Sequence, residues 1–199
     1  MTEHYQAYFC EENIWHLAAK MPGVVVFISN AHNQFAIWEQ KLARQDELDT
    51  PRPIDPYILW DYHVIFAHGP RGTADFENLA DYISQDECVI YDYDTQLPKP
   101  CQASRYFFNS FPVDKYLIPR EFQPCFRLID AKEYVNRFWS DRSHMKNENE
   151  EWSAVPPSWP CIMSEHKNKL RLTQLLDFTR PGNESIYELN DFQFSEHAD

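Results

Sequence analysis

The segment that most constrains the fold is the apolar run Val-Val-Val-Phe-Ile at residues 24–28, which directly follows Pro22-Gly23. Such an uninterrupted run, rich in β-branched residues, predicts a strand buried on both faces. Upstream of it, apolar residues recur at helical spacing: Cys10, Ile14, Leu17, Ala18 and Met21. We therefore expect a short helix with Cys10 in its first turn, ended by Pro22-Gly23 and followed by a buried strand.

Similar patterns predict the elements further along the chain. Strands are expected at residues 35–38, 57–68, 87–93 and 126–129. Helix-like patterns occupy residues 73–83 and 173–178, and Asp130 with Glu133 predicts the start of a helix that continues to Phe138. We expect the strands at 57–68 and 87–93 to form a long hairpin. The charged, proline-rich residues 39–56 predict a surface excursion.

Composition limits the class of protein. A chain of 199 residues can bury one sizeable core, so a single domain over residues 1–199 is expected. The net charge of -13 argues against nucleic acid or an anionic membrane as the main partner, because both attract clustered Lys and Arg. With neither a basic and apolar leader nor a stretch of membrane-spanning length, we expect a soluble protein of the cytoplasm. The nucleus is left open as a second compartment.

The cysteines do not suggest a structural framework. There are five of them, an odd number, and none has C-x-x-C spacing. This pattern indicates neither a set of disulfides nor a zinc ribbon, so we expect all five to be free thiols.

Cys10 has the position of a nucleophile. At a helix N-terminus, unpaired N–H groups and the helix dipole lower the pKa of a thiol and can bind an oxyanion. Glu11 and Glu12 oppose that lowering with their negative charge, so His63 would have to supply much of the activation. The alternative is that Cys10 is only a packed apolar residue.

A base and a carboxylate lie on the two arms of the predicted hairpin. Strand alternation places Asp61, His63 and Ile65 on one face, and Asp92 shares a face with Asp94. Antiparallel pairing would bring the His63 imidazole close to one of the two carboxylates, which would orient it. The alternative is a solvated strand face with a chance histidine.

Two other sets of polar residues indicate their roles less specifically. His63, His68 and either Asp92 or Asp94 are candidate metal ligands. We rank this metal site below the thiol hypothesis, because a five-residue spacing puts the two histidines on opposite strand faces. The polar residues 140–145 are expected to cap a helix end or to bridge to another element.

Taken together, these motifs resemble the protein N-terminal glutamine amidohydrolase family, which deamidates N-terminal Gln in the N-degron pathway. The resemblance covers most of the chain and rests on uncommon short sequence motifs that occur in the same order. These are CEENIW at 10–15, FISN at 27–30, WDYHV at 60–64, YDxDTxLP at 91–98, SDRSHM at 140–145 and PCI at 160–162. Residues 69–87 are longer than we expect for the family.

The resemblance implies a fold, a site and a reaction. It implies an α/β (α+β) fold similar to the papain and transglutaminase cores, with a mostly antiparallel sheet flanked by helices. Cys10 would be the nucleophile, His63 the base and then the acid, and Asp92, rather than Asp94, the orienting carboxylate. The reaction would pass through a thioester and need no metal or organic cofactor.

The resemblance also implies the partners. Proteins or peptides with a free N-terminal Gln would be the substrates, and the chain would act as a monomer. Asp61 is the expected partner of the substrate ammonium, because it is expected to share a strand face with His63. Two alternatives are a transglutaminase-like acyl transferase and a non-catalytic module that binds protein N-termini.

Overall fold

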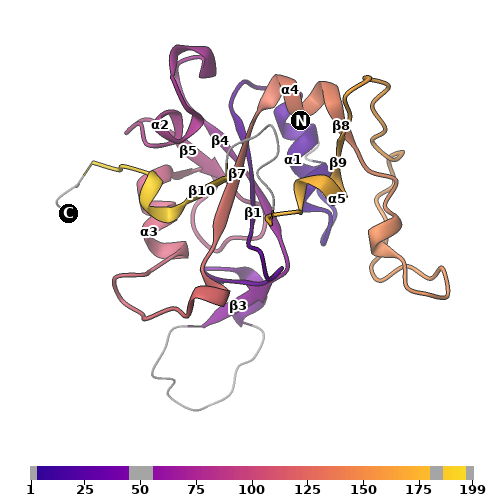
Figure 1. Ribbon diagram of the computed structural model, residues 1–199, viewed down its shortest axis with the longest axis horizontal. Coiled ribbons are helices and arrows are strands. Elements are labelled where there is room, and N and C mark those ends of the chain that lie inside the picture. The colour runs from indigo at the N-terminus through magenta and orange to yellow at the C-terminus, as the bar shows by residue number, and fades with distance from the viewer. Residues whose placement is uncertain (1–3, 45–55, 180–185, 196–199) are drawn as a thin grey trace.

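A six-stranded sheet organises the protein. The computed structural model describes residues 4–44, 56–179 and 186–195. All neighbouring strands of the sheet run antiparallel, in the order β10-β7-β1-β4-β5-β6. In that order they span Ile186–Glu188, Cys125–Asp130, Val24–Ser29, His63–His68, Val89–Tyr91 and Cys101–Gln102. Helices flank both faces (Figure 1), so the expectation of a mostly antiparallel sheet between helices is confirmed.

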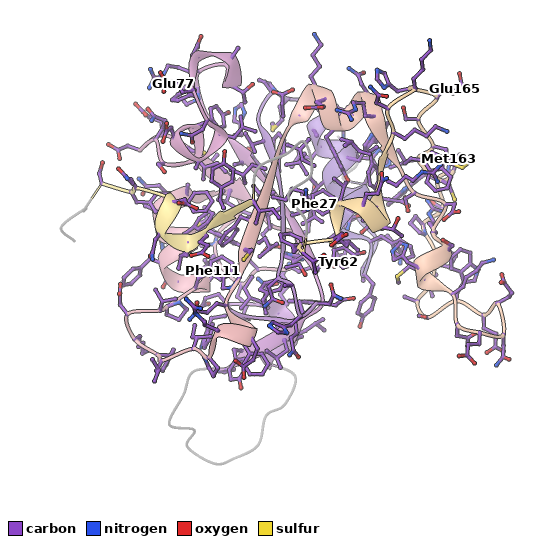
Figure 2. All side chains as sticks on the ribbon, viewed as in Figure 1. Phe27, Tyr62, Glu77, Phe111, Met163 and Glu165 are labelled. Atoms are coloured by element: carbon purple, nitrogen blue, oxygen red, sulfur yellow. The ribbon has the colours of Figure 1, made fainter. Side chains whose placement is uncertain are left out.

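Strand β1 is buried on both faces, as its apolar run predicts. Val24, Val26 and Ile28 pack into one core with α2 and α3, whereas Val25 and Phe27 pack into a second core with α1, α4 and α5. In Figure 2 the labelled Phe27 lies near α5 and Phe111, of the first core, lies beside α3. Burying an aliphatic or aromatic side chain of this size stabilises the fold by about 1.5–3 kcal/mol. Strand β1 therefore anchors both layers of helices.

The helices are short. The α-helices of the described residues are α1 (Cys10–Ala18), α2 (Leu79–Ile83), α3 (Ala103–Ser110), α4 (Ala131–Arg137) and α5 (Leu172–Leu175). The 3-10 helices there are η1 (Lys41–Arg44), η2 (Thr73–Asp75), η3 (Arg120–Phe122), η4 (Ser143–Met145) and η5 (Leu189–Asp191). Over these same residues, no helix has the length and apolar character needed to cross a membrane.

Two small sheets complete the described structure. Strands β2 (Phe35–Trp38) and β3 (Tyr57–Trp60) pair antiparallel, and β8 (Phe138–Trp139) pairs with β9 (Leu170–Arg171) in parallel.

The predicted strand at residues 57–68 is in fact two strands of different sheets. β3 pairs with β2, β4 pairs with β1, and the chain turns between them at Asp61 and Tyr62. The Asp61 carboxylate accepts the Tyr62 N–H at 2.8 Å, and the Asp61 carbonyl accepts the Ser29 hydroxyl at 2.6 Å. The expectation that Asp61 shares a strand face with His63 is therefore wrong, because these bonds hold Asp61 in the turn.

Other predicted elements differ mainly in their limits. The expected helix at 73–83 is divided into η2 and α2, the strand at 87–93 is shortened to β5, and the helix at 173–178 is the one-turn α5. The expected N-cap is confirmed, since Asp130 accepts the N–H groups of Lys132 and Glu133 at the start of α4. Most of the predicted excursion at 39–56 lies outside the described residues.

Candidate active site

Cys10 is the first residue of α1, and local contacts set where that helix begins. The Asn13 side chain donates to the Gln6 carbonyl at 2.9 Å and accepts the Gln6 N–H at 2.8 Å, which fixes the path of the chain into the helix. Phe9 is buried at the N-cap position and supplies no side-chain cap. The thiol therefore sits at an N-terminus whose first turn lacks a capping side chain.

His63 and Asp92 are in direct contact. His63 opens β4, Asp92 directly follows β5, and the antiparallel pairing of these strands brings the side chains together. His63 Nε2 lies 2.8 Å from Asp92 Oδ1, and both side chains are buried. The Trp60 ring stacks on the imidazole with the ring centroids 5.9 Å apart. Because Nε2 is bonded to the carboxylate, Nδ1 is the nitrogen left for a thiol.

Four donors surround the Asp92 carboxylate. Oδ1 also accepts the Asp94 N–H at 2.8 Å, while Oδ2 accepts Gln40 Nε2 at 3.0 Å and the Tyr106 hydroxyl at 2.8 Å. Burial alone would raise the pKa of Asp92, but His63 and these donors outweigh it and lower the pKa to about 2. Burial also acts to lower the pKa of His63, yet Asp92 reverses this and leaves that pKa raised. The pair thus favours an imidazolium beside a carboxylate.

A set of possible metal ligands does lie together here, but His68 is not part of it. Ligand atoms of His63, Asp92 and Asp94 lie within 4.8 Å of one another. His68, at the far end of β4, is instead 2.7 Å from the Pro22 carbonyl oxygen. Both oxygens of Asp92 already accept two hydrogen bonds each, so a metal ion would have to displace existing donors. The donor pattern therefore favours acid and base chemistry over metal ligation.

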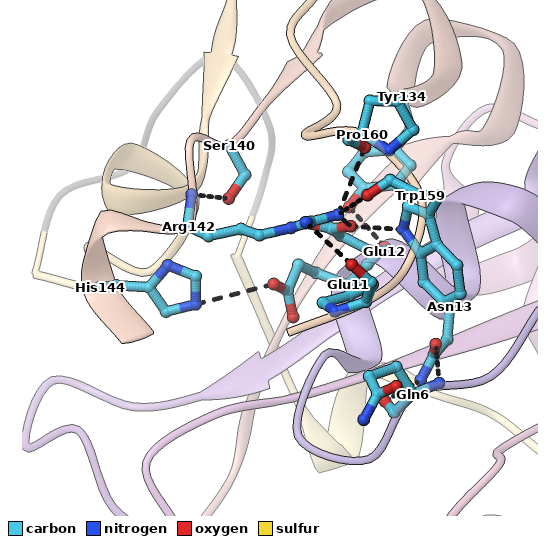
Figure 3. Close-up of polar contacts among 11 residues, drawn as sticks. Gln6, Glu11, Glu12, Asn13, Tyr134, Ser140, Arg142, His144, Trp159 and Pro160 are labelled. Carbon is cyan, nitrogen blue, oxygen red and sulfur yellow. Dashed lines mark hydrogen bonds and ion pairs between the residues drawn. The ribbon is translucent and has the colours of Figure 1, made fainter. Parts of the chain in front are cut away.

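Two consecutive glutamates follow Cys10, and both are fully buried. Arg142 binds Glu12 through two parallel hydrogen bonds of 2.7 Å, and Trp159 Nε1 donates to Glu12 at 2.6 Å (Figure 3). Arg142 has a left-handed backbone, with φ 62°. The polar segment at 140–145 therefore bridges to α1, which was one of its two expected roles.

Glu11 has weaker partners than Glu12. Its Oε2 accepts the Tyr62 hydroxyl at 3.2 Å and lies 3.7 Å from Cys10 Sγ. Its Oε1 makes no hydrogen bond, and His144 Nε2 lies 3.7 Å away (Figure 3). Burial, with the added charge of Glu12, raises the pKa of Glu11 to about 7. Glu11 is therefore a carboxyl group that changes charge near neutral pH.

The Cys10 thiol is neutral at rest. Burial raises the pKa of Cys10 well above its usual value, and Glu11 and Asp94 add to the rise, while the Val64 N–H bonds to the sulfur and lowers it. The expectation that the helix N-terminus would favour a thiolate is therefore wrong. As the sequence also indicated, activation of Cys10 depends on His63.

A cleft of about 570 Å³ lies beside this site. Its walls include the turn at Asp61 and Tyr62, Asn30 and Asn33 after β1, and residues at the end of α5. Asp61 is exposed on this wall, and its charge also raises the pKa of Cys10. Tyr62 joins the cleft to the site, because its ring lines the cleft and its hydroxyl contacts Glu11.

Known proteins match this chain along most of its length. The model of the family described as N-terminal glutamine amidase matches residues 5–194. The chain belongs to this family. Relatives named Protein N-terminal glutamine amidohydrolase include one from Danio rerio, 33% identical over 94% of this chain and 86% of its own length. One from Bos taurus is 34% identical over 94% and 84%, and one from Homo sapiens is 33% identical over 94% and 85%.

Sequence reasoning missed several residues of this N-terminal glutamine amidase site. Tyr106 belongs to α3, whose buried residues 103, 106, 107 and 110 do have helical spacing, so a signal was present. Gln40 gave no local signal, because its burial depends on the left-handed Glu39 and on pairing with Thr95. All five cysteines are free thiols, as expected.

Proposed function

We propose that this protein deamidates the N-terminal glutamine of proteins and peptides to glutamate, with release of ammonia, as part of the N-degron pathway. Membership of the N-terminal glutamine amidase family and the names of the relatives support this activity. The observation that carries the proposal is the buried His63–Asp92 pair at 2.8 Å, in which His63 begins β4, the strand that packs against the helix begun by Cys10. These are the groups that an activated cysteine nucleophile requires.

In the first half of the reaction, His63 in its neutral form takes the proton of the Cys10 thiol at Nδ1, and the thiolate attacks the side-chain carbonyl carbon of Gln. The Val64 N–H stabilises the thiolate, as its effect on the pKa of Cys10 indicates. The Cys10 N–H is the proposed donor to the oxyanion. The tetrahedral intermediate collapses as the imidazolium gives its proton to the amide nitrogen, so ammonia leaves and a thioester remains.

In the second half, His63 removes a proton from water, and the resulting hydroxide attacks the thioester carbon. The bond to sulfur breaks, and His63 returns the proton to the Cys10 thiolate. The sum is amide plus water giving carboxylate plus ammonium, with no change of oxidation state. Asp92 remains ionised throughout, because the charge and hydrogen bond of His63, with Gln40 and the Asp94 N–H, lower its pKa to about 2, and it stabilises the imidazolium.

The arrangement supports a finer fold assignment, a core like those of papain and transglutaminase. In support, the nucleophile begins a helix, and the base and carboxylate lie on adjacent antiparallel strands. One chain supplies all three groups. We accordingly propose that residues 1–199 act as one catalytic domain and as a monomer. We also propose that the protein acts in the cytoplasm.

Asp61 is the proposed partner of the substrate α-ammonium. Its carboxylate is exposed on the cleft and close enough to Cys10 to affect the pKa of the thiol. Residues after Gln would then lie along the cleft. An ammonium held at this distance leaves an Asn carbonyl about 1.5 Å short of the sulfur, and misplacement by about 1 Å can cost roughly 10²-fold in rate.

The test is mass spectrometry of peptides that begin with Gln, Asn or acetylated Gln, incubated with the purified protein. Only the free Gln peptide should gain about one dalton and release ammonia, and Cys10→Ala should abolish the reaction while remaining folded. Turnover of acetylated Gln, or activity retained in Cys10→Ala, would refute the assignment.

Two competing functions are tested in the same samples. Incorporation of a labelled amine in place of water would indicate transglutaminase-like acyl transfer. If iodoacetamide modified Cys10 no faster than the other four thiols and no ammonia appeared, a non-catalytic module that binds N-termini would be favoured.

A further inference from the structure

Glu11 is a buried carboxyl group beside the nucleophile, and it has no role in the proposed deamidation steps. It is 0% exposed, its Oε1 makes no hydrogen bond, and its Oε2 lies 3.7 Å from Cys10 Sγ. A buried polar atom without a hydrogen bond costs free energy, so Oε1 leaves the carboxyl group under-satisfied, while Oε2 is the oxygen next to the reacting sulfur. Glu12, equally buried, has Arg142 and Trp159 instead.

Among the described residues, no positively charged side chain forms a hydrogen bond with the Glu11 carboxylate, and the Arg142 charge acts on it only from a distance. Arg142, on the segment that carries η4, is held by Glu12 in two hydrogen bonds. Burial lowers the pKa of His144, which therefore stays uncharged at neutral pH. The negative charge of an ionised Glu11 therefore acts on the group that is bonded to the sulfur and on any group that approaches it.

The remaining neighbours of Glu11 are neutral or acidic. Burial raises the pKa of Tyr62, whose hydroxyl donates to Oε2, and of Tyr134 on α4, whose hydroxyl donates to the Glu11 carbonyl. On α1 itself the neighbours are the neutral Cys10 thiol and the paired Glu12. Tyr62 and Tyr134 therefore do not neutralise Glu11.

The position of Oε2 fits one half of a carboxamide. During attack the carbonyl carbon must lie about 3–3.5 Å from Sγ, and the amide oxygen is directed to the Cys10 N–H. An amide turned so that its nitrogen faces Glu11 would reach Oε2, because that oxygen is only 3.7 Å from the sulfur. A carboxylate accepts a hydrogen bond from an NH2 group, but it repels a second carboxylate.

Resting on the proposed deamidation, we propose that Glu11 distinguishes substrate from product at the sulfur. Its carboxylate accepts a hydrogen bond from the side-chain NH2 of Gln and repels the carboxylate of the Glu that is formed. The repulsion releases product and keeps N-terminal Glu peptides from occupying the site.

The proposal predicts a pH signature. Because burial raises the pKa of Glu11 to about 7, protonated Glu11 donates to a product carboxylate at lower pH, and ionised Glu11 repels it at higher pH. If product binds only the protonated form, its inhibition constant rises up to about tenfold per pH unit above 7. The product's own carboxyl group titrates near pH 4.3, well below this range.

The experiment measures inhibition of ammonia release by a Glu-leading peptide between pH 6 and 8.5, in the unaltered protein and in Glu11→Gln. We expect the inhibition constant to rise steeply with pH in the unaltered protein. It should rise less in Glu11→Gln, where the dependences due to His63 and to the α-ammonium of the peptide, which titrates at about pH 7.7–8.0, remain. Product should bind at least about tenfold tighter to Glu11→Gln than to the unaltered protein at pH 8. His144→Gln, which keeps the Glu11 charge, should retain the steep rise. Equal slopes in the unaltered protein and Glu11→Gln would overturn the proposal.

Direct binding gives a second measurement that needs no turnover. Glu-leading and Gln-leading peptides are titrated against Cys10→Ala and against Cys10→Ala with Glu11→Gln. Loss of the Gln preference in the double variant at pH 8 supports the proposal, and an unchanged preference contradicts it. If the unaltered protein released no ammonia, the proposed function would fail instead, and this binding comparison would still decide the role of Glu11.

Discussion

The candidate site has two sides, each built around a completely buried carboxyl group, and their chemistry is opposite. On the Asp92 side, four donors from His63, Gln40, Asp94 and Tyr106 fill both oxygens. On the Glu11 side, Oε2 has a hydroxyl and a thiol, and Oε1 makes no hydrogen bond. The pKa of Asp92 is lowered to about 2, whereas that of Glu11 is raised to about 7.

The difference teaches that a charged partner and hydrogen-bond donors, rather than depth of burial, decide which buried acid keeps its charge. A saturated carboxylate stays ionised and can orient a base without titrating. An unsaturated one titrates near neutral pH and can respond to the charge of a ligand. The charge on the Asp92 side of the site is therefore fixed, whereas the charge on the Glu11 side can change during the reaction.

The strongest way to break the comparison is to remove the charge on the saturated side. Asp92→Asn should lower kcat by about 10⁴, the loss seen when the orienting carboxylate of a serine triad is replaced. Asp94→Asn is the matched control and should cost far less, because the Asp94 side chain bonds to Tyr5 rather than to His63. Steady-state ammonia release measures both, with thermal unfolding to verify the fold. A larger loss at Asp94 would show that the carboxylates were assigned in the wrong order.

A smaller effect is expected when Arg142, the charged partner of Glu12, is replaced. Arg142→Met leaves a buried carboxylate unpaired and should lower the free energy of unfolding by about 3–5 kcal/mol. The double variant Glu12→Gln with Arg142→Met removes the stranded charge, so it should recover part of this loss. Urea unfolding measures the series. If the double variant were as unstable as Arg142→Met, lost packing rather than the unpaired charge would be the cause.

The smallest effect concerns stability and pH on the unsaturated side. Glu11 binds its proton more tightly in the folded state, where its pKa rises from 4.5 to about 7. Between these values only the folded state holds the proton, so stability falls as pH rises, by up to about 3 kcal/mol at about 1.4 kcal/mol per pKa unit. Glu11→Gln should lack this decline and be the more stable protein at pH 8. Denaturant unfolding from pH 5 to 8 in both proteins tests it, and parallel curves would contradict the assignment.

Much of this site follows from local sequence patterns. The apolar run of β1, the spacing that ends α1 and the hairpin of β4 and β5 are each set by periodicity within a few residues. Those elements are enough to bring His63 to Asp92 and to place Cys10 at the start of a helix. The choice of Asp92 over Asp94 required the family resemblance, because alternation treats both residues alike.

The parts that were not foreseen depend on contacts between distant segments. The apolar and aromatic residues of 57–68 continue on both sides of Asp61, so only the pairing of β3 with β2 shows that the strand breaks there. The burial of Glu11 and Glu12 likewise comes from residues 51 and 130 positions away, Tyr62 and Arg142 respectively. No local signal distinguishes these glutamates from two charges on a solvated helix.

The bond between Arg142 and Glu12 also bears on the order in which the protein is made. Cys10, His63 and Asp92 are all synthesised within the first half of the chain. The side chains that bind Glu12, the charged Arg142 and the neutral donor Trp159, lie 130 and 147 positions after it. A nascent chain that has exposed all three reacting groups still has an uncompensated charge in the first turn of the nucleophile helix. The site is therefore completed only late in translation, when the fold around it is nearly whole.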